Sequence, residues 1–177
     1  MSPTVYSPPV PTYTALATAE PDGSQSSITF SSIPANDPNG NSIRDLIVVF
    51  NGSGARYLAV RINGDTGSNY NTVAMYGIGS GSGTSGGTSN FGYIFASYSA
   101  ASTTGIRSGL IEFLDAKATD KHKSVLIRHN DMGAAGAVEA MAARWANSNA
   151  ITSIQVYSDN GSNFGTDTTI SLYAVVA

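Results

Sequence analysis

The chain has 177 residues, a length typical of one domain, and it contains no cysteine, which excludes a disulfide framework and any metal site built from thiolates. Only 12% of the residues are charged, and nine Lys and Arg stand against twelve Asp and Glu, so the basic surface that nucleic-acid binding needs is missing. The 41% of hydrophobic residues and the net charge of −3 predict a folded domain whose partners are not selected by charge.

The N-terminal region is rich in proline. All seven prolines precede residue 39. Because proline fixes φ and cannot donate to a sheet ladder, residues 1–11 are predicted to form an extended arm, and residues 12–177 a single β-sandwich domain. The arm is either a frayed terminus or a segment that lies on a neighbouring subunit. In the second case the candidate contact residues are Pro3, Tyr6, Pro8, Pro9, Pro11 and Tyr13.

No targeting segment is expected. Residues 1–16 contain no Lys or Arg and no apolar run of the length found in signal peptides. Nowhere does an apolar run approach the ~20 residues that a membrane-spanning helix requires.

Short segments of alternating apolar and polar residues recur along the chain after the arm. Several are rich in Val, Ile, Tyr, Phe and Thr, the residues that favour strands. We predict ten strands, at residues 12–17, 26–30, 45–50, 57–62, 71–78, 91–95, 109–114, 124–129, 150–157 and 168–175.

Residues 136–145 allow two interpretations. Their alanines favour a helix, whereas Val138, Ala140 and Ala142 alternate as they would in a strand. We favour a strand, because the elements around this segment are all predicted to be β.

Short strands without an evident helix predict an all-β protein with two packed sheets or a closed barrel, and we favour a jelly-roll-like antiparallel β-sandwich. Turn residues separate strands at residues 51–52, 63–65 and 159–161, and the last turn is predicted to be a hairpin-type connection. Longer loops are expected at residues 35–43, 77–90 and 131–136.

Residues 77–90 read GIGSGSGTSGGTSN and contain two well-known patterns by chance. A GxGxxG pattern starts at Gly81 and a GxSxG pattern starts at Gly83. Both motifs require a helix directly afterwards, and the segment that follows here is a predicted strand. We therefore predict a flexible loop rather than a nucleotide or nucleophile site.

Residues that carry catalysis are sparse. His122 and His129 lie seven residues apart on one predicted strand, so they point to opposite faces, and no evident carboxylate motif accompanies either. Glu112 and Asp115 also point to opposite faces of a strand, which excludes a local acid–base pair of the glycosidase type. We expect a protein that is not an enzyme, with no catalytic residue, no cofactor and no small-molecule substrate.

Oxygen-bearing side chains alternate at Asp37, Asn39 and Asn41, and again at residues 63–65, as they do in calcium-binding loops. The first segment lacks the distal bidentate Glu of such loops, and Asx-Pro-Gly segments commonly form turns. We therefore favour turns and expect no metal site.

Tyrosine is the most frequent aromatic residue, with nine copies. Tyrosines in or beside predicted strands are suited to a sugar-stacking platform, a subunit interface or the edge of the core. They are Tyr57, Tyr70, Tyr76, Tyr93, Tyr98, Tyr157 and Tyr173.

Three segments, taken together and in order, resemble a family of small virion structural proteins of tailed bacteriophages. The first is SSITFSSIPA at residues 26–35, followed by RDLIVV at 44–49; the second is RINGDTGSNY at 61–70. The third comprises AITSI at 150–154, NFG at 163–165 and TISLY at 169–173. The proline-rich arm and an insertion at residues 36–41 depart from the family pattern.

The resemblance implies a capsid decoration or cement protein, which forms a homotrimer and binds the major capsid protein on the outside of the capsid. Such a protein would be assembled in the bacterial cytoplasm, would bind no nucleic acid or membrane, and would stabilise the shell through many weak contacts with the assembled lattice. The alternatives are a tail- or fibre-associated virion protein and a carbohydrate-binding β-sandwich module.

Overall fold

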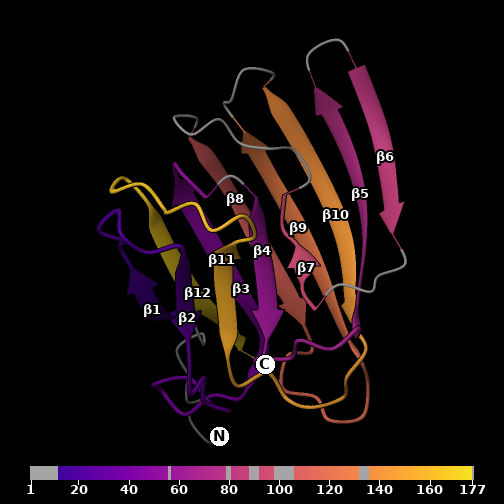
Figure 1. Cartoon of the computed structure of the whole chain (residues 1–177). Coiled ribbons are helices and arrows are strands. Elements are labelled where there is room, and N and C mark those ends of the chain that lie inside the picture. The colour runs from indigo at the N-terminus through magenta and orange to yellow at the C-terminus, as the bar shows by residue number, and fades with distance from the viewer. Residues whose placement is uncertain are drawn as a thin grey trace, which may run out of the picture.

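The computed structural model describes residues 12–55, 57–78, 81–87, 92–97, 106–131 and 136–176. These residues form two antiparallel sheets, a large sheet of eight strands and a small sheet of four strands, with no helix among them (Figure 1). The prediction of an all-β protein is confirmed. No helix in these segments is long and apolar enough to cross a membrane. The predicted arm at residues 1–11, with Pro3, Tyr6, Pro8, Pro9 and Pro11, lies outside the described residues.

The small sheet lies in front of one part of the large sheet in Figure 1, and β5 and β6 extend beyond it on the right. In spatial order, the large sheet consists of β1 (Tyr13–Ala19), β12 (Thr169–Val176), β3 (Ile43–Gly52), β8 (Arg107–Leu114), β9 (Lys123–Asp131), β10 (Ala137–Trp145), β5 (Tyr70–Ile78) and β6 (Gly81–Gly87). The small sheet consists of β2 (Ser27–Phe30), β11 (Ile154–Ser158), β4 (Leu58–Ile62) and β7 (Ile94–Phe95).

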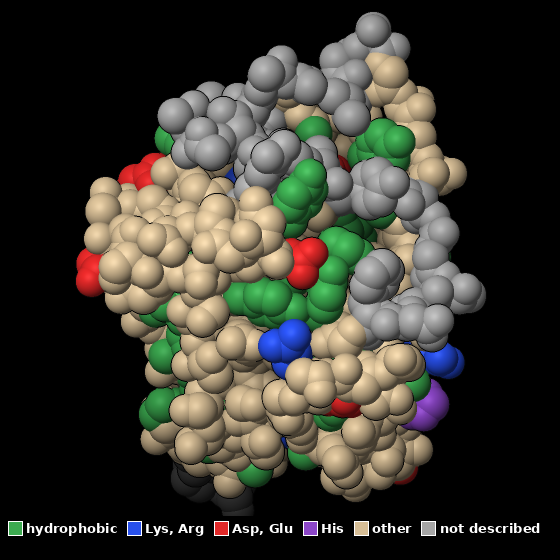
Figure 2. Space-filling view, viewed as in Figure 1, with side chains coloured by type: hydrophobic (Ala, Val, Ile, Leu, Met, Phe, Trp, Pro, Cys, Tyr) green, Lys and Arg blue, Asp and Glu red, His purple; other side chains and the backbone are tan. Residues whose placement is uncertain are grey.

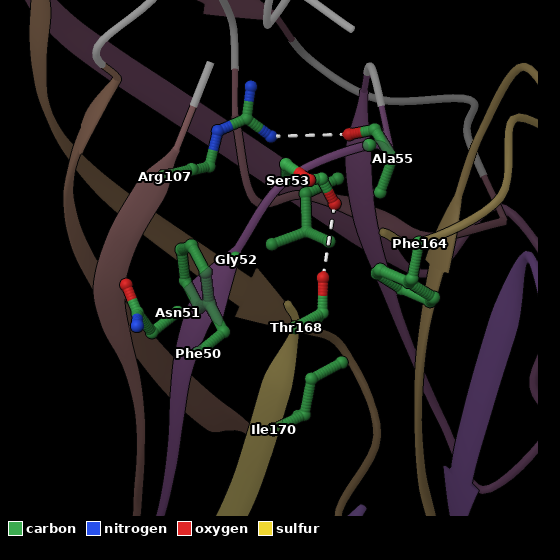
Figure 3. A pocket seen from close by; sticks show the side chains of 11 residues that line it. Phe50, Asn51, Gly52, Ser53, Ala55, Arg107, Phe164, Thr168 and Ile170 are labelled. Carbon is green, nitrogen blue, oxygen red and sulfur yellow. Dashed lines mark hydrogen bonds between the residues drawn. The ribbon is translucent and has the colours of Figure 1, made fainter. Parts of the chain in front are cut away.

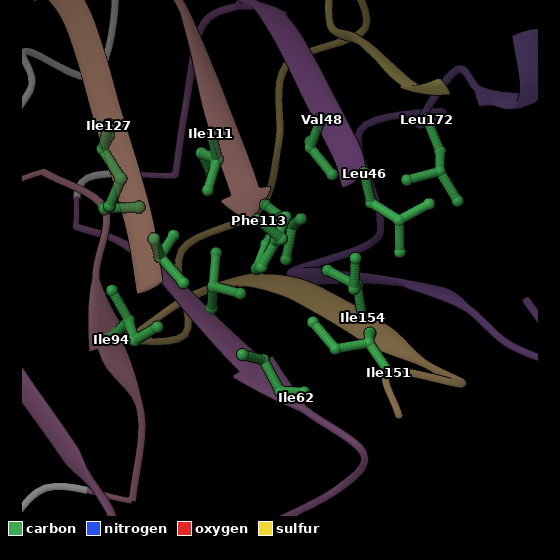
Figure 4. Close-up of a cluster of buried hydrophobic side chains, with 14 of the residues drawn as sticks. Leu46, Val48, Ile62, Ile94, Ile111, Phe113, Ile127, Ile151, Ile154 and Leu172 are labelled. Atoms are coloured by element: carbon green, nitrogen blue, oxygen red, sulfur yellow. The ribbon is translucent and has the colours of Figure 1, made fainter. Parts of the chain in front are cut away.

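The core fills the space between the two sheets, as Figure 4 shows for part of it. In β3 the inward side chains Leu46 and Val48 are fully buried, and in β4 the same holds for Val60 and Ile62. This arrangement follows from strand geometry, because alternate side chains point to opposite faces of a sheet. The apolar positions that predicted the strands therefore supply the side chains that hold the sheets together.

Residues 137–145 form the strand β10, so the strand interpretation of residues 136–145 is confirmed. Met141 and Trp145 are buried, whereas Val138 on the opposite face is 66% exposed. β10 pairs along its full length with both β9 and β5. Pairing on both edges outweighs the helical preference of its alanines, because propensity is a weak local effect.

The glycine-rich tract differs from its prediction as a flexible loop, because residues 81–87 form the edge strand β6, which pairs with β5. Glycine has little intrinsic preference for strands, so this strand depends on its partner. A Cβ atom at Gly83 would come within 2.7 Å of the Tyr76 hydroxyl. The missing side chain thus makes room for a tyrosine of the neighbouring strand.

Two turn predictions were also wrong. The turn at residues 159–161 connects β11 of the small sheet to β12 of the large sheet, so it crosses between sheets instead of closing a hairpin. Residues 51–52 form the last two positions of β3 rather than a turn. Sequence signals mark where the chain can bend or end a strand, but sheet membership is decided by distant strands.

Replacing Ile111 with Ala tests the placement of the core. Ile111 is fully buried between the sheets, so Ile111→Ala is expected to lower the free energy of unfolding by about 2–5 kcal/mol, measured by urea denaturation. The matched control Ile106→Ala alters a side chain that is 45% exposed, and its effect should stay below about 0.5 kcal/mol. Equal losses in the two variants would contradict the placement.

Candidate functional site

The outer face of the small sheet carries three clustered rings, Tyr93, Phe95 and Tyr157, which we call the aromatic patch. Because side chains alternate along a strand, Ile94 points into the core, and its neighbours Tyr93 and Phe95 point outward. Tyr157 on β11 stands opposite Ala59 on β4, which is fully buried although it belongs to the outer face. Figure 2 views the molecule from this side and shows hydrophobic side chains in a hollow between a basic and an acidic side chain.

The rings of the patch contact one another edge to face. The centroids of Tyr93 and Phe95 lie 4.9 Å apart, and those of Tyr93 and Tyr157 lie 6.0 Å apart, with interplanar angles of 72° and 77°. Edge-to-face pairs of this kind are the preferred arrangement of aromatic rings. The patch is therefore preorganised and presents ring edges and hydroxyl groups together.

Arg61 on β4 forms one border of the patch. Its Nε donates to the Gly92 carbonyl at 3.2 Å, its Nη1 to Gln155 Oε1 at 3.0 Å and its Nη2 to the Tyr157 hydroxyl at 3.1 Å. The guanidinium carbon lies 4.8 Å from the centroid of the Tyr157 ring. Hydrogen bonds and the cation–π contact hold the guanidinium in one orientation, which keeps a fixed positive charge beside the rings.

Asp159 forms the other border of the patch, where its Oδ2 accepts a hydrogen bond of 2.9 Å from the Tyr93 hydroxyl. Burial and this hydrogen bond raise the pKa of Tyr93 above its ordinary value. Burial also raises the pKa of Tyr157 to about 12, although Arg61 opposes this effect. Both phenols stay neutral near physiological pH, so the patch is suited to binding by ring contact and hydrogen bonding rather than to proton transfer.

The tyrosines named from the sequence divide by sheet face. Tyr93 and Tyr157 meet in the patch, whereas Tyr70 is fully buried and Tyr173 lies on β12 of the large sheet. Tyr98 lies outside the described residues. The alternation around β7 and β11 predicted outward side chains, but only the pairing of both strands with β4 shows that these side chains meet.

The turn at residues 63–69 uses its oxygens for hydrogen bonds within the chain. The Asp65 carboxylate accepts from Trp145 Nε1 at 2.7 Å, from Asn69 Nδ2 at 2.8 Å and from the Gly67 amide at 2.8 Å. The Tyr70 hydroxyl donates to the Asp65 carbonyl at 3.0 Å. The ring of Tyr70 stacks on the ring of Trp145. The oxygens that suggested a calcium loop face N–H and O–H donors in this turn.

Asn63 joins the same turn to the segment before β11. Its Oδ1 accepts from the amides of Thr152 and Ser153 at 2.8 and 3.0 Å, and its Nδ2 donates to the Ala150 carbonyl at 2.8 Å. Its φ of 52° lies in the left-handed region, where Asn is tolerated better than most residues. Asn63 therefore serves as a structural connection between distant segments.

Asp37 has the same role at the other predicted calcium segment. Its Oδ1 accepts from the amides of Asn39 and Asn41 at 2.9 and 2.8 Å, and its Oδ2 accepts from the Thr14 hydroxyl at 3.1 Å. These contacts form an Asx-type turn and tie it to β1. The preference for turns at both segments is confirmed.

The two histidines differ in setting. His122 precedes β9 and is exposed, whereas His129 on β9 is buried with its Nε2 at 3.0 Å from Glu139 Oε2 on β10, and both of these side chains have no solvent exposure. The sequence search missed this pair, because residues 129 and 139 become neighbours only through the β9–β10 register. Full burial of the two groups points to a structural contact between β9 and β10 rather than an accessible acid–base site.

A small cavity lies near this buried pair, between β3, β8 and the segment before β12 (Figure 3). It has a volume of about 20 Å³, enough for one water molecule. Arg107 donates to the Ala55 carbonyl at 3.4 Å and Thr168 to the Ser53 carbonyl at 3.1 Å along its wall. The cavity is too small for an organic ligand, so the aromatic patch is the better candidate for a binding site.

A scan against models of known protein families finds no match for this chain, and neither does a search of curated proteins. The likeness to phage virion proteins therefore stays a prediction from the residues that carry it.

Replacing Asp65 with Asn tests the hydrogen bonds of the 63–69 turn. Burial alone would raise the pKa of Asp65, but the hydrogen bonds from Trp145, Asn69 and Gly67 outweigh burial and lower it below 3.8. A carboxyl whose pKa is lower in the folded state adds stability above its unfolded pKa and loses it as the pH falls through the folded pKa. Asp65→Asn is expected to lower the free energy of unfolding by about 1–3 kcal/mol near neutral pH.

The difference between wild type and Asp65→Asn should shrink below about pH 4, which thermal unfolding across a pH series measures. The matched control Asp120→Asn removes an exposed carboxylate and should change little at any pH. A loss that is independent of pH would contradict the proposed cause.

Proposed function

We propose that this chain is a non-enzymatic structural protein of a tailed-bacteriophage virion, and specifically a capsid decoration protein that binds the outside of the capsid lattice. The observation that carries the proposal is the strand order of the two sheets, which supports a jelly-roll topology. Jelly rolls recur in viral capsid and lectin domains.

A jelly roll has eight strands in two sheets, with the orders 1-8-3-6 and 2-7-4-5 in chain numbering. Here β1-β12-β3-β8 lies in the large sheet, and β2-β11-β4-β7 forms the small sheet. Renumbering these eight strands in chain order reproduces both jelly-roll orders. The remaining strands β9, β10, β5 and β6 extend the large sheet beyond β8.

The segments that resemble phage virion proteins lie next to one another in space, which supports the resemblance. β11 pairs with β2 on one edge and with β4 on the other, and β12 pairs with β3. Asn63 of the second segment bonds to Thr152 and Ser153 of the third. These pairings and hydrogen bonds make the three segments one connected part of the fold.

The surface is suited to attachment by many weak contacts. Tyr and Arg are enriched at protein interfaces, and the aromatic patch offers both. Tyr13 on the edge strand β1 directly follows the predicted arm and is 61% exposed. The proposed partners are the major capsid protein and further copies of this chain on the capsid surface, and the proposed attachment segment is the arm at residues 1–11.

Deleting residues 1–11 tests the attachment. The full chain is expected to co-sediment with empty capsids, and the truncated chain is expected to lose most of this binding, because repeated weak contacts depend steeply on each single contact. Thermal unfolding of the truncated chain should be unchanged, which controls for folding. Full retention of the truncated chain on capsids would contradict the role of the arm, and no binding by the full chain would contradict the decoration function.

A sugar-binding role is the second candidate, because the aromatic patch combines rings with the polar groups of Arg61, Gln155 and Asp159. This role predicts binding in a glycan screen, and Tyr157→Ala should weaken it about tenfold. Tyr173→Ala removes a half-buried tyrosine of the large sheet and serves as the matched control. Equal binding by both variants would exclude the patch as a sugar site.

A further inference from the structure

The centre of the outer face of the large sheet is mostly apolar, although it has no covering layer among the described residues. We call this central part the apolar face. Val138, Met75 and Val73 are 66, 59 and 54% exposed there, and Leu126 and Val49 are 41 and 39% exposed. An antiparallel sheet with one face in water usually alternates apolar inward and polar outward residues. Contiguous exposed apolar surface on a sheet therefore marks an interaction site.

Strand registers place most of these side chains in two adjacent rows across five strands. Val138 lies in the next row, between Asn130 on β9 and Gly77 on β5. One row runs Val49, Leu110, Arg128, Ala140 and Met75. The other row runs Ile47, Glu112, Leu126, Ala142 and Val73. Each row thus holds four apolar residues and one charged residue.

The two charges sit diagonally at the centre of the apolar face. Leu110 stands opposite Arg128, and Glu112 stands opposite Leu126, so the four residues form a square in which the charges occupy one diagonal and the leucines the other. Neither Glu112 nor Arg128 forms an ion pair with another described residue. Two opposite charges without an ion-pair partner, in a mostly apolar surrounding, favour an occupant that supplies their complements.

We propose that the apolar face binds the same face of a second copy of this chain, with two-fold symmetry. A two-fold axis along the line from Leu110 to Leu126 exchanges the positions of Glu112 and Arg128. Each Glu112 then lies over the partner's Arg128, and each leucine meets its own copy, as an isologous interface requires. From ordinary strand spacing and residue rise, the strands of the two sheets would cross at about 70°, close to orthogonal sheet packing.

The outer surface of the whole large sheet, with the apolar face at its centre, has the size that a stable dimer needs. Eight strands of seven to ten residues cover roughly 900 Å² at normal strand spacing, and a standard interface buries about 800 Å² on each partner. Most of the apolar residues lie on β9, β10 and β5, which extend the sheet beyond the eight strands of the proposed jelly roll. The inference concerns the chain alone and holds whether or not it binds capsids, and its two-fold pairing differs from the homotrimer that the family resemblance implies.

Charge reversal tests the pairing. Sedimentation equilibrium of the full chain is expected to show a dimer of twice 18.2 kDa. Arg128→Glu and Glu112→Arg should each raise the dissociation constant at least about tenfold, because each places like charges opposite one another twice in the dimer. The double variant restores both pairs and should return the constant to within about threefold of wild type.

Lys121→Glu, which changes the charge of the exposed loop before β9 by the same amount, serves as the control and should leave the dimer unchanged. Thermal unfolding of each variant separates loss of pairing from loss of folding. A wild type that stays monomeric up to its solubility limit, or a trimer that Arg128→Glu leaves intact, would overturn the proposal. Because no capsid is present, neither result bears on capsid attachment.

Cross-linking locates the axis independently. The chain has no cysteine, so Leu126→Cys introduces a single thiol at the two-fold axis. Packed sheets lie about 10 Å apart, too far for a disulfide, and a bis-maleimide of similar reach should therefore link two chains efficiently. The control Asp120→Cys carries its thiol in an exposed loop and should give little cross-linked product. Equal yields from both variants would contradict the axis.

Discussion

The hydrogen bonds of the 63–69 turn connect the two sheets at one end of the molecule, and the packing of the rest depends on this connection. The chain leaves the small sheet at the end of β4 and enters the large sheet at the start of β5, so the turn sets how the sheets are placed relative to each other. The Asp65 carboxylate binds Trp145 at the end of β10, and Asn63 binds the segment before β11. A change in this turn therefore acts on both sheets together.

Because the sheets are held in this way, their outer faces are free to differ in chemistry. The outer face of the small sheet carries rings whose polar groups already have partners, such as Arg61 with Gln155 and Tyr93 with Asp159. The centre of the outer face of the large sheet is mostly apolar, and its two central charges form no ion pair with another described residue. The first face suits reversible contact with a polar surface, whereas the second suits lasting association with a like surface. A protein that repeats on a lattice would need both kinds of contact.

The interior of the large sheet also contains buried polar and charged side chains. His129 faces Glu139 across β9 and β10, and Phe50 lies 6.2 Å from the His129 ring. Lys123 is fully buried and donates to the carbonyls of Ala118 and Ser148. Groups of this kind cost free energy to bury unless they are paired. The His129–Glu139 contact therefore depends on the register of β9 and β10, and Lys123 depends on the loops that supply its acceptors.

Local signals predicted much of the fold, and the errors have a common cause. Alternation in the sequence found β3, β9 and β12 close to their observed bounds, because the period of two is a property of each strand alone. β6 escaped prediction because its glycines carry no such signal, and its strand conformation comes from pairing with β5. The buried pair of His129 and Glu139 escaped for the same reason, since it exists only through the register of β9 and β10.

The sequence by itself thus determined the all-β class, the lack of any disulfide and the turns at Asp37 and residues 63–65, all of which depend on composition or on neighbouring residues. Only the tertiary structure decided which strands share a sheet, which tyrosines meet in the aromatic patch, and where Glu112 and Arg128 lie on the apolar face. The physical reason is that these relations join residues far apart in the chain. Their energies come from pairing and burial, and a local pattern does not contain them.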